Sequence, residues 1–207
     1  MMKGTFITIE GCEGVGKSTQ IRLLKKYLDD SGQKAVFTRE PGGTEVAEKI
    51  RQILLNGGAI APITEAYLFA AARADHMEQL ILPALSRGEI VVCDRFLDSS
   101  LAYQGNARSL GEKKVYEINQ HALSGRLPDC TVFIDMHPAT SWRKQKGTSI
   151  ADDRLENEGA DFHNSVYEGF IKLANTESRF LRVVPNDDKD ITHRDIVAAL
   201  RTRGCIK

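Results

Sequence analysis

Apolar residues along the chain gather in five short runs rich in β-branched side chains, and stretches of helical periodicity separate these runs. The runs at residues 90–93 and 132–134 show no polar alternation, which is typical of strands buried on both faces. Strands separated by helices favour right-handed crossovers within a parallel sheet. We therefore predict an α/β fold with a doubly wound, five-stranded parallel sheet and helices on both faces. The predicted strands are residues 6–10, 34–38, 90–93, 131–135 and 180–184.

Helix signals lie between these strands. Thr44 is a candidate N-cap for a helix that ends near residues 56–58. A longer helix is predicted over residues 64–87 with Gly88 as its C-terminal cap, and Pro83 predicts a kink or an early end. The apolar face of the first helix is formed by Val46, Ile50, Ile53 and Leu54. Two later amphipathic helices are marked by Phe162, Val166, Phe170 and Leu173, and by Ile196 and Leu200.

Residues 11–18 read G-C-E-G-V-G-K-S, which matches the phosphate-loop pattern G-x-x-x-x-G-K-S. The loop follows a predicted strand and precedes a helical run, and this context disfavours the alternative of a glycine-rich turn without a ligand. The glycines let successive N–H groups point at one anion, and the helix dipole adds positive potential. Lys17 would reach the terminal phosphates and the Ser18 hydroxyl would bind Mg²⁺. The predicted ATP-binding residues are Gly11, Cys12, Glu13, Gly14, Val15, Gly16, Lys17, Ser18 and Thr19.

Composition narrows the class of protein. The length of 207 residues predicts one domain over residues 1–207. Because 28 basic residues balance 28 acidic ones, the chain has no net charge that would attract nucleic acid or a membrane surface. No apolar run approaches the ~20 residues of a membrane span. The first predicted strand leaves no room for a signal peptide, so we expect a cytoplasmic protein. The four cysteines have no C-x-x-C spacing and are expected to be reduced, and the histidines show no zinc-ligand spacing.

One segment departs from the strand and helix pattern. Residues 143–154 are polar, carry both charges and contain Gly-Thr-Ser between two helical stretches. We predict a mobile lid at about residues 143–157; a solvated surface loop is the alternative.

Absent motifs separate the classes of phosphate-loop protein. The chain has no N-K-x-D, which a GTPase needs to recognise guanine, and no Asp-Glu pair at a strand end, as a motor or helicase has. The two acids at predicted strand ends are Asp94 and Asp135. Arg95 directly after Asp94 suits a second bound anion.

Four stretches together resemble the bacterial type of thymidylate kinase, over essentially the whole chain. They are the phosphate loop, R-E-P-G-G-T at 39–44, F-A-A-A-R at 69–73, and D-R-F at 94–96 followed by S-S-L-A-Y-Q at 99–104. The resemblance implies a P-loop NTPase fold and transfer of the γ-phosphoryl group of ATP to dTMP, with Mg²⁺, in a homodimer. The alternatives are another nucleoside or nucleotide kinase of this fold and a nucleotide-binding switch without turnover.

Phe69 and Arg73 are four residues apart and so share one helix face, where a ring can stack on a base and a guanidinium can donate to its edge. Ordinary core packing is the alternative for Phe69. The resemblance implies that Gln104 also bonds the base, that Glu13 meets the 3′-hydroxyl and that Tyr103 disfavours a 2′-hydroxyl. The implied substrate-binding residues are Glu13, Arg39, Arg51, Phe69, Arg73, Arg95, Ser100, Tyr103 and Gln104.

The arginines among these residues suit the acceptor phosphate, because a guanidinium offers bidentate geometry to phosphate oxygens. For Arg51, a solvated helix charge is the alternative. Asp94 is expected to hold Mg²⁺ with Ser18, directly or through water. A phosphate monoester is mostly dianionic at neutral pH, so no general base is required.

Gly14 leaves the phosphate loop without the arginine that another branch of the family carries there. The resemblance therefore assigns charge stabilisation to the lid, with Arg154 and Arg143 first among candidates that include Lys144 and Lys146. The loop at residues 185–188 and the start of the lid helix are expected to hold adenine. The predicted catalytic residues are Lys17, Asp94, Arg95, Arg143 and Arg154.

Overall fold

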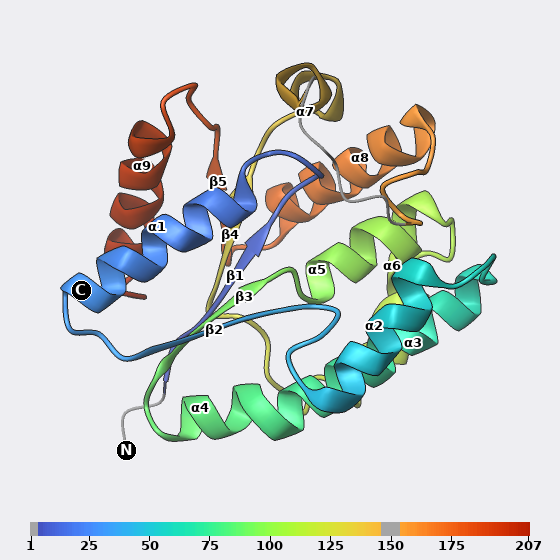
Figure 1. Ribbon diagram of the computed structural model, residues 1–207, viewed down its shortest axis with the longest axis horizontal. Coiled ribbons are helices and arrows are strands. Elements are labelled where there is room, and N and C mark those ends of the chain that lie inside the picture. Colours follow the sequence, from blue (N-terminus) through green and yellow to red (C-terminus); the bar gives the residue numbers. More distant parts are fainter. Residues whose placement is uncertain (1–3, 146–153) are drawn as a thin grey trace.

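A single parallel sheet forms the centre of the molecule. The computed structural model describes residues 4–145 and 154–207 (Figure 1). All strand pairs are parallel, in the order β2-β3-β1-β4-β5. The strands are β1 (Phe6–Glu10), β2 (Ala35–Arg39), β3 (Ile90–Asp94), β4 (Cys130–Ile134) and β5 (Phe180–Val183). The predicted five-stranded parallel sheet is confirmed, and each strand lies within one residue of its predicted position.

Helices cover both faces of the sheet. On one face lie α1 (Lys17–Asp30) and α9 (Lys189–Thr202), which pack against each other (Figure 1). On the other face lie α4 (Leu82–Ser86), α5 (Leu97–Ser100) and α8 (Ala160–Thr176). Further from the sheet are α2 (Glu45–Asn56), α3 (Pro62–His76) and α6 (Glu112–Asn119), while α7 (Pro138–Gln145) follows β4. The doubly wound arrangement is therefore confirmed.

The core lies between the sheet and these helices. Every residue of β1 and β4 is buried, so neither strand has a solvent face that would require alternating polar residues. Phe133 on β4 stacks on Phe170 of α8, with ring centroids 5.4 Å apart. None of the helices in the described ranges combines the length and the apolar character that crossing a lipid bilayer requires.

Thr44 caps α2 as predicted, because its hydroxyl accepts a hydrogen bond from the Ala47 backbone N–H at 3.3 Å. The predicted apolar face of this helix is only partly in the core. Leu54 is fully buried, whereas Val46 and Ile53 are 49% and 52% exposed. Helical periodicity placed these residues near one another but could not show that the neighbouring helix, α3, covers only part of that face.

The predicted long helix differs from the structure at its start and near its proline. It begins at Pro62, which occupies the first turn where no N–H is needed, and not at Thr64. A π-helical segment, η1 (Met77–Ile81), precedes Pro83, and the chain then continues as α4 to Ser86. The wider π turn accommodates the missing N–H, so the helical path does not end there. Gly88, with a φ of 78°, lies just after the end of α4, at the position predicted for the C-terminal cap.

The expectation that all four cysteines are unpaired was wrong. Cys130, at the start of β4, forms a disulfide with Cys205, which follows α9. The two positions are 75 residues apart and meet because the C-terminal segment returns to the sheet. Such a contact depends on tertiary packing, and cysteine spacing does not reveal it. Cys12 and Cys93 are free and buried.

Candidate active site

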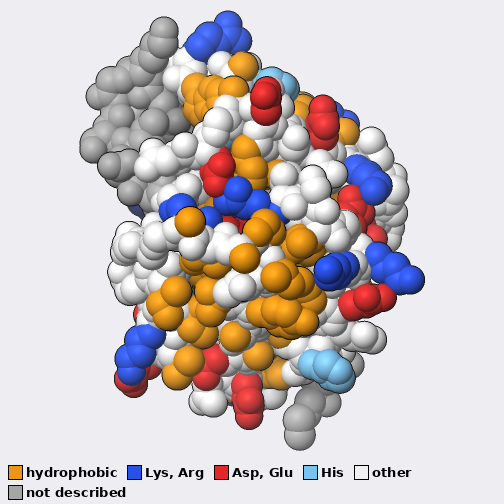
Figure 2. Space-filling view, turned by 90° about the vertical axis from the view of Figure 1, so that its right-hand side faces the viewer, with side chains coloured by type: hydrophobic (Ala, Val, Ile, Leu, Met, Phe, Trp, Pro, Cys, Tyr) orange, Lys and Arg blue, Asp and Glu red, His pale blue; other side chains and the backbone are white. Residues whose placement is uncertain are grey.

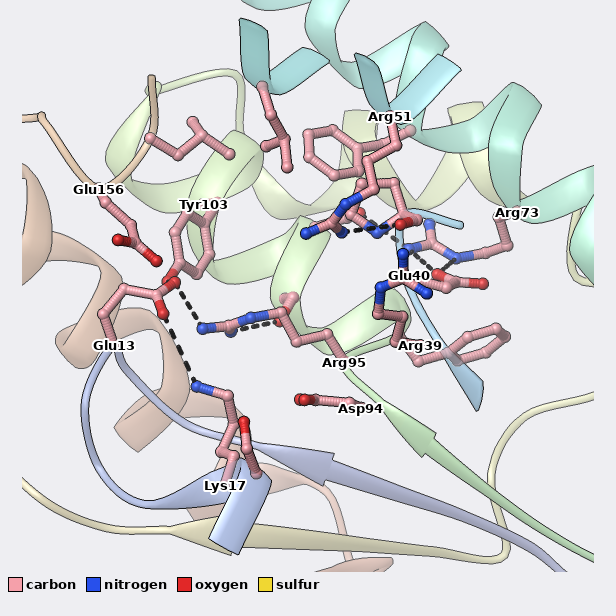
Figure 3. A pocket seen from close by; sticks show the side chains of 18 of the residues that line it. Glu13, Lys17, Arg39, Glu40, Arg51, Arg73, Asp94, Arg95, Tyr103 and Glu156 are labelled. Carbon is pink, nitrogen blue, oxygen red and sulfur yellow. Dashed lines mark hydrogen bonds and ion pairs between the residues drawn. The ribbon is translucent and has the colours of Figure 1, made fainter. Parts of the chain in front are cut away.

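A cavity of about 510 Å³ lies at the carboxyl ends of the central strands, where parallel α/β sheets collect their ligands (Figure 3). It brings together stretches that are far apart in sequence, from the phosphate loop to the segment after β3. Gly11, Cys12 and Val15 are buried within the loop itself. The predicted site residues that line the cavity are Glu13, Gly14, Gly16, Lys17, Ser18, Thr19, Arg39, Arg51, Phe69, Arg73, Asp94, Arg95, Ser100, Tyr103 and Gln104.

The phosphate loop joins β1 to α1. Gly11 has a φ of 144°, and a side chain there would meet the Ile134 carbonyl at 2.8 Å, so the loop can approach β4 closely only with glycine. Lys17 folds back over the loop, and its Nζ donates to the Gly11 and Cys12 carbonyls at 3.2 and 2.8 Å. Burial, followed by the charge of Arg95, lowers the pKa of Lys17. A bound triphosphate would favour its charged form.

Glu13 lies between three donors at one wall of the cavity (Figure 3). Its Oε1 accepts from Arg95 at 2.7 Å and from the Tyr103 hydroxyl at 3.0 Å, and the Lys17 Nζ lies 4.0 Å from its Oε2. Burial opposes ionisation of Glu13, but the charges of Arg95 and Lys17 outweigh it and lower the pKa of Glu13 to about 2. Glu13 is therefore a fixed carboxylate that can accept a hydrogen bond from a ligand hydroxyl.

Arg95 is held in the left-handed region, with a φ of 65°. The buried carboxyl group of Glu10, at the end of β1, accepts from the Phe96 N–H at 2.8 Å and from the Ser99 hydroxyl at 2.6 Å. That hydroxyl in turn accepts from the Arg95 guanidinium at 3.0 Å. Glu10 thus fixes both the backbone and the side chain around Arg95. This role of Glu10 was not predicted, although a carboxyl group at the end of an apolar strand was a visible signal.

Arg73 reaches the cavity from α3 although it is almost fully buried. Its Nε donates to Glu40 at 2.9 Å, its NH2 group donates to the Ser100 hydroxyl at 3.1 Å, and its NH1 group donates to Asn119. His76 contacts the other oxygen of Glu40 at 3.1 Å. Glu40 and Asn119 were not predicted as site residues, because their contacts with Arg73 depend on the approach of two other segments to α3.

Three predicted phosphate ligands, Arg39, Arg51 and Arg95, line the same cavity (Figure 3). Arg39 also pairs with Glu48 at 3.0 Å, and Arg51 donates to the Pro41 carbonyl at 2.9 Å. The cavity is lined by five basic side chains, Lys17, Arg39, Arg51, Arg73 and Arg95, and by four acidic ones, Glu13, Glu40, Asp94 and Glu156. The guanidinium groups among them are suited to bind phosphate oxygens.

The two arginines of the predicted lid are not brought to the cavity. Arg154 donates to the Leu54 carbonyl at 3.0 Å and to Glu65 at 2.6 Å, and it does not line the cavity. Arg143 is exposed on α7 and donates to the Ala139 carbonyl of its own helix at 3.2 Å. Residues 146–153 of the predicted lid, which include Lys146, lie outside the described residues, as does the side chain of Lys144. The transition-state role of these cations stays a prediction.

Asp94 meets a condition for a metal site. Its Oδ1 is buried and has no hydrogen-bond partner within the described part of the chain. Ser18 lines the same cavity. No group of three or more His, Cys, Asp or Glu side chains suited to a metal occurs among residues 4–145 and 154–207. The Asp94 carboxylate and the Ser18 hydroxyl are oxygen ligands of the kind that Mg²⁺ takes together with substrate phosphates and water.

The sheet order, the loop between β1 and α1 and the arginine-lined cavity define a phosphate-loop nucleotide-binding protein of the P-loop NTPase type. The family model for thymidylate kinase matches residues 9–196. The chain belongs to the thymidylate kinase family.

Related proteins are similar over nearly their whole length. A thymidylate kinase of Clavibacter michiganensis subsp. michiganensis is 48% identical over 98% of this chain and 95% of its own. One from Thermoanaerobacter sp. (strain X514) is 46% identical over 97% and 98%. Among solved structures, the thymidylate kinase from Ehrlichia chaffeensis has a TM-score of 0.80 and 30% identity, covering 96% of this chain and 99% of that one.

Proposed function

We propose that this chain transfers the γ-phosphoryl group of ATP to dTMP, giving ADP and dTDP. Membership of the thymidylate kinase family supports this activity. The observation that carries it in the structure is a single cavity that is lined at one end by the phosphate loop and elsewhere by Phe69 and Arg73. A donor triphosphate and an acceptor nucleotide can therefore lie in one continuous space, as in-line transfer requires.

Catalysis here rests on positioning and on charge neutralisation, because the acceptor phosphate is already an adequate nucleophile. Lys17 contacts the transferring phosphoryl group, and Arg39, Arg51 and Arg95 hold the acceptor phosphate. Ser18 and Asp94 would hold Mg²⁺, which neutralises phosphate charge when it is bound. Lys17 is buried and Arg95 is largely buried, which strengthens their effect on a bound phosphate.

The acceptor nucleoside lies toward α3. Phe69 stacks on thymine, and Arg73 and Gln104 hydrogen-bond the edge of the base. Glu13 accepts a hydrogen bond from the 3′-hydroxyl, and Tyr103, which donates to Glu13, leaves no room for a 2′-hydroxyl. Ser100 supports this subsite through its contact with Arg73.

We propose that residues 143–157 act as a lid and that Arg154 and Arg143 stabilise the transition state. In the structure these arginines are bonded away from the cavity, so this role requires a rearrangement once both nucleotides are bound. The absence of a cation at Gly14 supports a second source of positive charge.

We propose that two copies of the chain associate through the outer face of α2 and α3. Val46, Ile53 and Tyr67 are each about half exposed there, and Figure 2 shows a broad hydrophobic patch on this side of the molecule. Exposed apolar patches commonly mark protein interfaces. Ile53→Lys should lower the mass measured by light scattering to that of one chain. We also propose that the enzyme works in the cytoplasm.

The direct test is an ADP-release assay with MgATP and one acceptor at a time: dTMP, dUMP, dCMP, dGMP or thymidine. Release should depend on an acceptor and should be fastest with dTMP. Arg73→Ala should raise the KM for dTMP and leave the KM for ATP unchanged, whereas Arg87→Ala at an exposed position serves as a control. Faster transfer to another acceptor would assign a different nucleotide kinase, and ADP release independent of any acceptor would contradict the proposal.

A further inference from the structure

We propose that Glu65 is a positioning residue that fixes the amide of Gln104, so that the carbonyl oxygen of Gln104 faces the base and selects pyrimidines carrying a hydrogen on N3. This inference rests on the proposed function, because it specifies how the acceptor subsite distinguishes thymine and uracil from cytosine. Glu65 does not line the cavity and so acts only through another side chain.

Glu65 is completely buried on α3, and both of its oxygens receive N–H groups. The Gln104 Nε2 donates to Oε1 at 2.9 Å, and Arg154 donates to Oε2 at 2.6 Å. Arg108 lies 3.4 Å from each oxygen. A carboxylate occupied in this way only accepts hydrogen bonds. The amide group of Gln104 can therefore face it only with its nitrogen, since two oxygens without a proton would repel each other.

This orientation decides what Gln104 offers to a ligand. The side chain lies on η2 (Leu101–Ala107), lines the cavity and is almost fully buried. With Nε2 committed to Glu65, the Oε1 end remains for the base. Arg73 lines the same cavity and can only donate. The subsite thus presents one donor and one acceptor.

Thymine and uracil show the matching pattern, with O4 as acceptor and N3–H as donor. Cytosine shows the reverse, with an amino group at position 4 and an unprotonated N3. In the orientation imposed by Glu65, cytosine would set oxygen against N3 and donor against donor. A subsite built to hydrogen-bond one pattern rejects the other strongly, because its buried polar groups are then unpaired.

The negative charge of Glu65 is balanced by the charged side chains around it. Arg108 and Arg154 supply two positive charges, and Glu158 contacts Arg108 at 2.5 Å as the second acid. Within the described part of the chain, the side-chain hydrogen bond of Gln104 goes to Glu65, and that of Glu158 to Arg108. The chain therefore contains a matched pair of glutamates that share Arg108, of which only Glu65 touches the amide.

The experiment measures the dissociation constants of dTMP, dUMP and dCMP by titration calorimetry on Glu65→Gln. A neutral amide at position 65 can either accept or donate, so Gln104 can turn its amide around. The preference for dTMP over dCMP should fall about tenfold, as expected for one misplaced hydrogen bond. The ratio of dTMP to dUMP should stay unchanged, because both bases carry N3–H. Glu158→Gln should retain the wild-type preference.

Action through Gln104 is tested by a double variant. In a Gln104→Met background, Glu65→Gln should leave the dTMP to dCMP ratio unchanged. If Glu65→Gln does not fold, the Glu65→Gln, Arg154→Gln double variant removes one charge of each sign and takes its place. On the wild-type protein, dTMP methylated at N3 should bind at least about tenfold more weakly than dTMP.

A folded Glu65→Gln protein with the wild-type ratio would overturn the inference, as would an equal loss in Glu158→Gln. Equal binding of dTMP and its N3-methyl derivative to the wild-type protein would also overturn it, whatever the variants do. A wild-type protein that does not prefer dTMP over dCMP at all would instead contradict the proposed function.

Discussion

Replacing Glu40 by glutamine should destabilise the folded protein far more than the loss of an exposed ion pair would. Glu40 and Arg73 are both almost fully buried, and two nitrogens of Arg73 lie 2.9 and 2.8 Å from the carboxylate. Glu40→Gln keeps the shape but leaves the guanidinium without its counter-charge. Breaking a buried ion pair from one side costs about 3–5 kcal/mol.

The structure places this variant at the lower end of that range. Ser100 and Asn119 still accept from Arg73, and the Phe96 ring lies 5.0 Å from its guanidinium carbon. We therefore expect a loss of about 3 kcal/mol in the free energy of unfolding, which is about a hundredfold in the folding equilibrium constant. Such a loss is a large share of the 5–15 kcal/mol that is usual for a domain.

The assay is urea unfolding of both proteins, with the free energy extrapolated to water and the m-value compared. Glu45→Gln is the matched control, because Glu45 pairs with Lys49 at 2.8 Å on the surface, where both side chains are more than 70% exposed. That variant should lose less than about 1 kcal/mol. A loss below about 1 kcal/mol for Glu40→Gln, with an unchanged m-value, would refute the view that Arg73 depends on Glu40.

Three further predictions concern catalysis and pH. Lys17→Ala should fold normally and lose ADP formation, and near-normal turnover would contradict the assignment of the loop. Arg154→Ala and Arg143→Ala should each lower kcat with little change in the KM for dTMP. If both variants and the double variant kept the wild-type kcat, these arginines would not stabilise the transition state, and the lid would serve only to exclude water. Burial first, and then the charge of Asp98, raises the pKa of Glu10 from 4.5 to about 8. The folded protein therefore holds a proton that the unfolded chain releases, so the stability that this group contributes is full below pH 4.5 and is lost as pH rises through about 8. Urea unfolding of Glu10→Gln across this range should show a smaller fall in stability with pH than the wild type, and an equal fall would contradict the prediction.

Local sequence was sufficient for the sheet, the phosphate loop and most helix ends. An unbroken apolar, β-branched run such as residues 90–93 is typical of a strand covered on both sides, and the motif at residues 11–18 stands between a strand and a helix. Because the carboxyl ends of parallel strands meet at one edge, motif residues at the ends of β1, β2 and β3 line one cavity.

Tertiary structure decided which side chains hold the site residues in place. Glu10, Glu40 and Glu65 carry no motif that names their partners, and each touches a residue at least 30 positions away. Whether a glutamate is a solvated surface charge or a buried anchor depends on what packs over it, and sequence spacing does not encode this.

The dependence on tertiary packing also explains two predictions that the structure corrected, for the apolar face of α2 and for the cysteines. The face of α2 that carries Val46 and Ile53 has helical periodicity in either case, but only the packing of α3 against α2 determines which part of it is buried. Cys130 and Cys205 are paired by the return of the chain after α9. The sequence by itself determined the elements and the chemistry of the phosphate loop, because these depend on neighbouring residues. Only the tertiary structure decided the contacts between elements, because they depend on distances that the order of residues does not contain.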